Sequence, residues 1–273
     1  MIEDFFFLDD GQVKITVASV GISKHRWVYV NESEIESNKH IDLMTKNKFD
    51  HLPIVLESGL VAEYFRTKEP NNFSEIERVK IHYDDILPLD TNIKEVIERF
   101  SDERRFYFLT YQKKISGLIT IGNLNCKQVQ VYIFNLICEL ERELGNFVNS
   151  KLSSEEIINW LSKKQNMGNE DCKYNHILEE FRRLTALDLE NQITEHFFLV
   201  DFFCIIKDFE LNKKLEYTNQ KWIDLNSINE LRNRIAHPTR SLLDNENTID
   251  RLKRRLKRAE ELLFRLNIQQ QNL

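Results

Sequence analysis

Short apolar runs alternate with one amphipathic segment over the first 125 residues. The runs are bounded by polar residues, which favours β-strands, and they occupy 28–30, 52–55, 60–62, 106–109 and 115–120. Before the last two runs, apolar residues at i, i+3, i+4 and i+7 predict one face of a helix: Ile93, Val96, Ile97 and Phe100. Asn92 and Glu95 are expected to form a capping box at its start. This part of the chain is therefore predicted to be α/β.

The rest of the chain has the longer hydrophobic period of amphipathic helices. Its first stripe has one polar break, at Glu141, and comprises Val131, Phe134, Ile137, Glu141 and Leu144. Shorter helices are expected at 155–161 and 177–187, and the segment 193–209 is apolar on nearly all sides, which is typical of a central bundle helix. Two further apolar sets mark the last helices: Ile228, Leu231 and Ile235, then Leu252, Leu256, Ala259, Leu263 and Leu266. This part is predicted to be an all-α helical bundle.

Composition narrows the class of protein. Hydrophobic residues make up 41% and charged residues 30% of the 273 residues, a balance typical of soluble domains. Only 7 Gly and 4 Pro are present, which excludes collagen-like and low-complexity chains and disfavours turn-rich all-β folds. The acidic N-terminus does not resemble a signal peptide. No uncharged apolar stretch reaches the length of a membrane span, so we expect a cytoplasmic protein with no membrane partner.

Neither the cysteines nor the overall charge indicates a metal site or a general nucleic-acid binder. The cysteines lie far apart and without metal-ligand spacing, at Cys126, Cys138, Cys172 and Cys204. The formal net charge of −6 disfavours binding driven by a broad positive field. Residues 1–126 hold 16 basic and 21 acidic residues, whereas 232–265 hold ten basic and five acidic residues. A local basic surface is therefore expected near the C-terminus.

One segment of the α/β part resembles a CBS domain, whose order is strand, helix, two strands, helix. The resemblance rests on the opening 86–97 and on the closing signature 117–124, Gly-Leu-Ile-Thr-Ile-Gly-Asn-Leu. An earlier, degraded copy is similar at 27–30, 34–44, 49–55 and 59–62. Because CBS domains occur in pairs, the resemblance implies a tandem module over residues 12–125.

The CBS resemblance implies that the clefts between the repeats bind an adenosine-containing ligand such as ATP, ADP or AMP. The family closes on Thr/Ser-x-x-Asp, in which the hydroxyl contacts phosphate and the carboxylate contacts ribose; Thr120 and Asn123 stand at these positions. Asn keeps an acceptor oxygen but loses the charge. The residues matching the adenine slot are Ile86, Leu87 and Pro88. The first copy has Phe65-Arg66-Thr67 in place of the signature, so one working cleft is expected. The alternative is a module with empty clefts that only dimerises.

The helical part carries an Arg and a His with four residues between them on a late amphipathic helix, in the segment Asn229–Pro238. Arg232 is followed by the polar Asn233, and His237 is followed by Pro238, which disfavours helical geometry at His237. This motif and the helix order of residues 127–268 resemble the HEPN superfamily. The resemblance implies a metal-independent ribonuclease that acts as a homodimer on RNA and needs no catalytic cofactor.

The chemistry of these side chains suits cleavage by the ribose 2′-OH. Arg232 supplies a permanent forked cation for a phosphate, His237 titrates near neutrality and can transfer a proton, and Asn233 can orient either group. Five residues of an ideal helix subtend about 140°, so Arg232 and His237 do not converge fully within one chain. A two-fold dimer overcomes this by pooling both copies. The sequence thus predicts catalytic Arg232, His237 and Asn233 at a dimer interface.

Simpler interpretations remain open for each of these features. Arg232 and His237 are also compatible with an ordinary helix end, or with a HEPN-like dimerisation unit that does not cleave RNA. The basic run 251–258 is either a solvated helix face or a track for the RNA backbone, and His196 is expected to be a core histidine with its hydrogen bonds satisfied. The sequence favours a nucleotide-regulated endoribonuclease. The alternative is a non-catalytic protein that binds adenine nucleotide and docks a partner.

Overall fold

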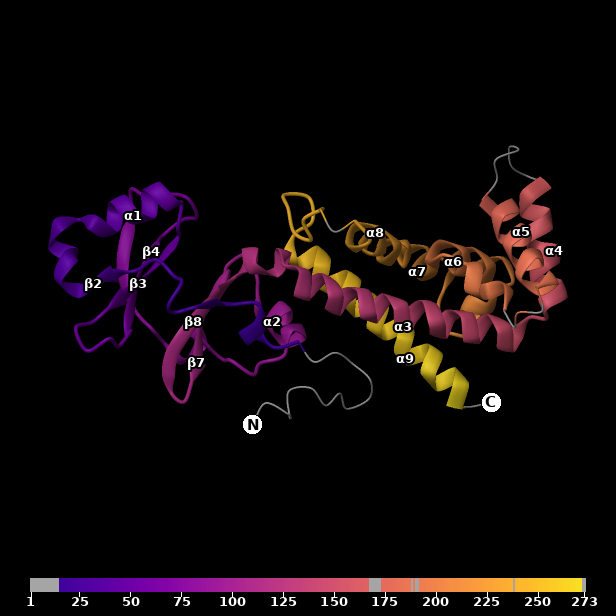
Figure 1. The fold of residues 1–273 in the computed structure, drawn as a ribbon, viewed down its shortest axis with the longest axis horizontal. Coiled ribbons are helices and arrows are strands. Elements are labelled where there is room, and N and C mark those ends of the chain that lie inside the picture. The colour runs from indigo at the N-terminus through magenta and orange to yellow at the C-terminus, as the bar shows by residue number, and fades with distance from the viewer. Residues whose placement is uncertain (1–14, 167–172, 188, 190–191, 238, 272–273) are drawn as a thin grey trace. The chain divides into compact units, whose positions relative to one another are not determined.

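The computed structural model describes residues 15–166, 173–187, 189, 192–237 and 239–271 (Figure 1). Residues 12–14 of the expected CBS module, Cys172 and Pro238 lie outside the described residues. The chain forms two compact units. The described residues of Met1–Val129 with Leu243–Asp250 form unit 1, and those of Gln130–Leu242 with Arg251–Leu273 form unit 2. Unit 1 is α/β and unit 2 is helical, which confirms the predicted fold class.

The first repeat of unit 1 is a four-stranded sheet of order β2-β3-β4-β5. Strand β2 (Val30–Asn31) is parallel to β3 (His51–Val55), and helix α1 (Lys39–Asn47) connects them after the 3-10 helix η4 (Glu32–Ser37). Strands β4 (Glu63–Thr67) and β5 (Ile76–Lys80) then continue the sheet in antiparallel fashion.

The second repeat has the same order of strand, helix, strand and strand. Strand β6 (Ile86–Pro88) is parallel to β7 (Phe106–Tyr111), with α2 (Ile93–Arg99) between them, and β8 (Lys114–Thr120) is antiparallel to β7. Strand β1 (Ile22–Ser23) adds to the free edge of β8, giving the order β1-β8-β7-β6. Short 3-10 helices flank these strands: η3 (Val17–Ser19), η5 (Tyr83–Asp85) and η6 (Ile121–Asn125).

Helix α2 forms where its apolar spacing predicts. Ile93, Val96 and Ile97 are buried, and Asn92 caps the helix by accepting a hydrogen bond from the Lys94 backbone N–H at 2.9 Å. Glu95 does not close the predicted capping box. Its carboxylate instead accepts a hydrogen bond from Arg99 one turn later, at 2.7 Å.

The first repeat differs from its predicted strands in three places. The expected strand 28–30 is confirmed only at Val30, because β2 spans Val30–Asn31. The expected strand 60–62 is wrong, because Gly59 takes a positive φ of 76° in the turn after β3 and the next strand begins at Glu63. The residues Phe65–Thr67, which stand where a closing signature was sought, lie inside β4. Strand β5 was not predicted, because it is a half-exposed strand in which charged residues replace a continuous apolar run.

Unit 2 consists of helices joined by short segments, and α3 and α9 each begin in unit 1. The longest helices are α3 (Lys127–Lys151) and α9 (Ile249–Gln271). The others are α4 (Ser154–Asn166), α5 (Lys173–Ala186), η7 (Ile193–His196), α6 (Leu199–Asp208), η8 (Leu211–Lys213), α7 (Asn219–Asp224) and α8 (Asn226–Ile235). The apolar sets predicted for α8 and α9 are buried, which confirms these two helices. No helix among the described residues combines the length and apolarity that spanning a membrane requires.

Two predictions for unit 2 are corrected. The segment 193–209 is not one helix, because η7 ends at His196 and α6 begins at Leu199, where the Asp201 carboxylate accepts a hydrogen bond from the Phe198 backbone N–H at 2.9 Å. In α3 the predicted stripe is out of phase at its start: Val131 and Phe134 are 38% and 48% exposed. The buried hydrophobic positions of α3 are Val129, Ile133, Ile137, Leu140, Leu144, Phe147 and Val148.

Candidate functional site

The two predicted signature residues of the second repeat bond with each other. Asn123 Oδ1 accepts hydrogen bonds from the Thr120 backbone N–H at 2.8 Å and from the Thr120 hydroxyl at 2.9 Å. These bonds close the first turn of η6, directly after β8. The single hydroxyl proton of Thr120 is thereby engaged, and the Nδ2 hydrogens of Asn123 remain as donors for a ligand. A phosphate could accept a hydrogen bond from Thr120 only by displacing Asn123.

The predicted adenine residues lie on a separate face. Leu87 is fully buried, whereas Ile86 and Pro88 line a surface hollow of about 820 Å³ that also includes Tyr107 and Thr110. Strand β7 separates β6 from β8, and neither Thr120 nor Asn123 lines the hollow. Unit 1 therefore brings Ile86 and Pro88 together but does not place the predicted phosphate and ribose contacts beside them.

The cations around this hollow are already paired. Arg104 donates to the Asp85 carboxylate and to the Asp84 carbonyl, both at 2.8 Å, and Arg99 donates to Glu95. A carboxylate neutralises each guanidinium, so the hollow favours a flat apolar group over a phosphate.

An aromatic cluster joins the two repeats. The ring of His51 on β3 stacks on Phe106 of β7 with centroids 4.5 Å apart, and Tyr64 on β4 meets Phe108 edge-on at 5.4 Å. Burial lowers the pKa of His51 to about 4, so this imidazole is neutral at physiological pH. His51 is accordingly a packing residue and supplies no charge for a phosphate.

The predicted catalytic arginine of unit 2 contacts helix α3 and the residue that precedes α6. Arg232 on α8 donates from Nε to Oε1 of Glu141 on α3 at 3.4 Å, and its guanidinium carbon lies 5.5 Å from the centre of the Phe198 ring. Its side chain is 28% exposed. Arg232 is therefore a positioned cation that keeps access to solvent.

His237 and Asn233 are exposed and lie apart from these contacts. Helix α8 ends at Ile235, and the His237 backbone N–H donates to the Arg234 carbonyl at 3.2 Å in the turn beyond. The structure records no hydrogen bond between Arg232 and His237 within the described residues of this chain. One chain thus supplies a guanidinium and an imidazole about one helical turn apart along the sequence, without a direct contact between them.

The residues that surround Arg232 were not predicted as parts of its site. Glu141 was visible as the polar break in the apolar stripe of α3, whereas no local pattern marks Phe198. Cys138 lies one turn before Glu141. Its pKa is raised, first by burial and then by the Glu141 charge, and the Arg232 charge opposes this shift without reversing it. Phe198 beside Arg232 is 52% exposed, and Phe134 on α3 is 48% exposed, so unit 2 has partly exposed apolar side chains.

The basic run of α9 is largely structural. Arg251 and Arg255 both donate to the Glu230 carboxylate of α8, and the Arg255 side chain is only 5% exposed. Arg258 donates to the Asp224 carbonyl at 3.0 Å and to the Ser227 hydroxyl at 2.8 Å. These arginines join α9 to α7 and α8, which disfavours the RNA track that the sequence left open.

The histidine of η7 departs from expectation. His196 was predicted to have its hydrogen bonds satisfied, yet its buried Nε2 has no hydrogen-bond partner among the described residues. Its ring meets Phe181 edge-on at 6.4 Å.

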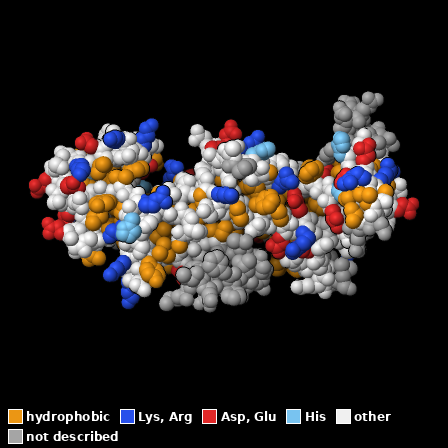
Figure 2. Space-filling model, in the orientation of Figure 1, with side chains coloured by type: hydrophobic (Ala, Val, Ile, Leu, Met, Phe, Trp, Pro, Cys, Tyr) orange, Lys and Arg blue, Asp and Glu red, His pale blue; other side chains and the backbone are white. Residues whose placement is uncertain are grey.

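Within the described ranges, no group of three or more His, Cys, Asp or Glu side chains is arranged to hold a metal ion. On the face seen in Figure 2, basic, acidic and apolar side chains of unit 2 are intermingled.

No family model matches the chain, and no curated protein matches it. Among solved structures, the CBS domains of a transcriptional regulator from Streptococcus pneumoniae are similar at 16% identity and a TM-score of 0.30, covering 39% of this chain and 92% of that one. A conserved CBS-domain protein from Thermoplasma acidophilum is similar at 14% identity and a TM-score of 0.30, covering 41% and 67%. A CBS-domain-containing protein from Agrobacterium tumefaciens is similar at 13% identity and a TM-score of 0.27, covering 43% and 96%. Because these TM-scores are low, the function of unit 1 is inferred from its own strand order and side chains.

Proposed function

We propose that the chain is a regulatory protein in which residues 12–125 act as a CBS-type sensor of an adenine nucleotide and residues 127–268 act as the effector. The observation that carries this proposal is the repeated order of strand, helix, strand and strand in unit 1, which matches the CBS order except for its closing helix: β5 follows the first copy and η6 follows the second. Only the second repeat continues into a Thr120/Asn123 turn, so we propose one working nucleotide site.

The sensor is tested by calorimetric titration with ATP, ADP and AMP. Asn123→Asp restores the carboxylate of the family signature and is expected to tighten nucleotide binding by about tenfold, because a charged acceptor strengthens a hydrogen bond by about 1.4 kcal/mol. Gln128→Glu adds the same charge at an exposed position of α3 and serves as the control. Equal responses of the two variants, or no binding of any of the three nucleotides, would exclude this site.

A metal-independent endoribonuclease is the proposed activity of the effector. It is favoured by the way Arg232 is held between Glu141 and Phe198 while it remains open to solvent, with His237 exposed beyond the end of the same helix. In a homodimer, two copies of α8 would supply the guanidinium for the phosphoryl oxygens and the imidazole for proton transfer, with Asn233 orienting either group. Neither a metal nor a catalytic cofactor enters this mechanism.

The effector is tested on single-stranded RNA in EDTA. Arg232→Ala and His237→Ala are each expected to reduce cleavage at least about 100-fold, the scale of a lost general acid–base or charge-stabilising group. Arg240→Ala removes an exposed charge close to His237 and is expected to leave cleavage unchanged. Native mass measurements check that all variants keep the same oligomeric state.

The RNA assay also decides between this activity and a non-catalytic regulator. If no RNA is cleaved while adenine nucleotides raise the melting temperature, the helical unit is better described as a partner-docking or dimerisation unit. The partly exposed Phe134 and Phe198 favour that alternative.

A further inference from the structure

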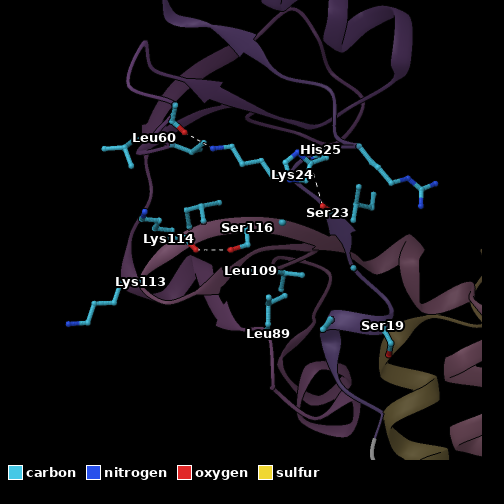
Figure 3. A pocket seen from close by; sticks show the side chains of 18 residues that line it. Ser19, Ser23, Lys24, His25, Leu60, Leu89, Leu109, Lys113, Lys114 and Ser116 are labelled. Atoms are coloured by element: carbon cyan, nitrogen blue, oxygen red, sulfur yellow. Dashed lines mark hydrogen bonds between the residues drawn. The ribbon is translucent and has the colours of Figure 1, made fainter. Parts of the chain in front are cut away.

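A cationic cavity of about 800 Å³ opens in unit 1 and is not explained by the sites above (Figure 3). Three turns form it: the turn after β1, the β3–β4 turn and the β7–β8 turn. Among the described residues, its lining includes Lys24, His25, Arg26, Lys113 and Lys114 and no Asp or Glu. An anion in this cavity would therefore meet cations and neutral groups without a repelling carboxylate.

The turn after β1 is fixed on the second sheet. The Lys24 backbone N–H donates to the Ser116 carbonyl of β8 at 2.7 Å, and the Arg26 backbone N–H donates to the Ser23 carbonyl at 2.9 Å. Gly117 permits this close approach, since a Cβ there would lie 2.6 Å from the Ile22 carbonyl oxygen. The backbone carrying three consecutive basic residues is thus held in place before any ligand arrives.

Lys24 spans the cavity. Figure 3 shows its side chain reaching from the turn after β1 towards the Gly59–Leu60 turn, where Nζ donates to the Gly59 carbonyl. An ammonium has three hydrogens, so donors remain for an anion. Lys24 can therefore contact a ligand while it still connects the first repeat to the second.

The opposite wall comes from the β7–β8 turn. Its two central residues, Gln112 and Lys113, have φ values of 47° and 63°, a left-handed conformation that costs a non-glycine residue about 1 kcal/mol or more. Figure 3 shows Lys114 and Ser116 beside the cavity, whereas Lys113 extends away from it. The hydroxyls of Ser23 and Ser116 add neutral hydrogen-bonding groups to the same lining.

The basic residues of the cavity differ from several arginines elsewhere in unit 1. Arg66, Arg78 and Arg104 each form an ion pair with a carboxylate. In the part of the chain that the structure describes, no ion pair involves any of the five basic residues that line the cavity. Like charges that share a concave site repel one another and raise the local concentration of anions. The cavity thus has the electrostatics of an anion site without an internal counterion.

We propose that this cavity binds the di- or triphosphate group of a small molecule, with Lys24 and Lys114 as its principal contacts. The shared chemistry is a chain of phosphates, either free or carried by a nucleoside. Leu60, Leu89 and Leu109 line the same cavity and supply an apolar surface for the part of the ligand beyond the phosphates. Neither Thr120 nor Asn123 lines this cavity, so this site is separate from the nucleotide site proposed above.

The direct test is calorimetric titration of the full chain with inorganic pyrophosphate. The double variant Lys24→Gln/Lys114→Gln is expected to weaken binding at least about 100-fold, about tenfold for each lost charge-assisted contact. Lys46→Gln removes one exposed charge from α1, outside the cavity, and is expected to leave the affinity unchanged. Circular dichroism melts verify that each variant is folded.

Further arms identify the source of the phosphates. If ATP binds more tightly than pyrophosphate and its affinity falls in the double variant, the site is assigned to a nucleotide. If ATP and pyrophosphate bind the wild type with equal affinity, the site is assigned to free polyphosphate. The proposal is overturned if pyrophosphate does not bind at millimolar concentration or binds the double variant and the wild type equally. The proposal would also be overturned if single-stranded RNA bound in a way that required Lys24 and Lys114 while pyrophosphate did not bind. If the Asn123 variant changes ATP binding and the double variant does not, that binding belongs to the Thr120/Asn123 site.

Discussion

The two repeats of unit 1 share one strand order but differ in the segment after their last common strand. In the first repeat, β4 is followed by β5, which extends the sheet. In the second, β8 runs into η6, where Thr120 and Asn123 bond with each other. The difference shows that one framework of strand, helix, strand and strand accommodates either a further strand or a polar turn at its end.

The strongest test of this comparison removes the aromatic cluster that the repeats share. Phe108 on β7 is fully buried and meets Trp27 and Tyr64 edge-on. Phe108→Ala is expected to lower the free energy of unfolding by about 3–5 kcal/mol, because it removes a large buried ring and leaves a cavity. Urea denaturation followed by circular dichroism measures the loss.

Tyr83→Ala is the control for this truncation, since Tyr83 is 91% exposed. It is expected to change stability by no more than about 0.5 kcal/mol. Equal effects of the two substitutions would show that the shared cluster does not hold the repeats together.

Acidification gives the next largest effect. The folded-state pKa of His51 is about 4, below its unfolded value of about 6.5, so the unfolded chain binds more protons between these pH values. Stability is therefore full above pH 6.5 and falls as the pH drops towards 4, by up to about 3 kcal/mol. Denaturant unfolding across this pH range measures it.

His51→Phe keeps the stacked ring and is expected to abolish this pH-dependent loss. His40 in the first repeat stacks on Phe65 at 4.1 Å, and partial burial also lowers its pKa. Because His40 is less buried than His51, His40→Phe is expected to remove a smaller part of the pH dependence. If His40→Phe removed more of the pH dependence than His51→Phe, the main acid-sensitive packing would lie within the first repeat instead of between the repeats.

Glycine substitutions compare the hairpins of the two repeats. Gly117→Ala places a Cβ 2.6 Å from the Ile22 carbonyl oxygen and is expected to cost about 1–3 kcal/mol by separating β1 from β8. Gly59→Ala meets no atom within 4 Å but must adopt a φ of 76°, which costs about 1 kcal/mol. Thermal melts of both variants measure the difference. A smaller loss for Gly117→Ala would mean that β1 moves away from β8 freely.

The smallest effect concerns the extra strand of the first repeat. Arg66 on β4 donates to Glu77 on β5 at 2.6 Å, and both side chains are partly exposed. Glu77→Gln is expected to cost about 0.5 kcal/mol and to lose its effect at high salt. Glu95→Gln breaks the Arg99 pair on α2 and is the matched control in the second repeat. Hydrogen exchange should increase on β5 in the first variant only, and exchange that is unchanged there would show that β5 does not depend on this pair.

Much of the fold was predictable because each element carries its own period. The continuous apolar run of β7 and the stripes of α2, α8 and α9 marked elements that the structure confirms. Strand β5 was missed because its charged residues pair across the sheet with β4, and this pairing has no local period. The segment 193–209 was predicted as one helix because apolar composition does not register the turn that Asp201 fixes at Phe198.

The sequence predicted which types of residue could form the candidate sites, but not which residues lie next to them in the fold. Thr120 and Asn123 were singled out as ligand contacts, yet their mutual hydrogen bonds were not foreseen. Lys24 and Lys114 were not singled out, because 90 residues of chain separate them and neither belongs to a motif.

The sequence by itself determined that this chain has an α/β part and a helical part, and it identified most of the buried faces. Hydrophobic spacing reports which side of an element avoids water, and that information is local. Only the tertiary structure decided that Glu141 faces Arg232 and that three turns of unit 1 enclose a basic cavity. Such pairings arise from the packing of elements distant along the chain, and no local period encodes which of them become neighbours.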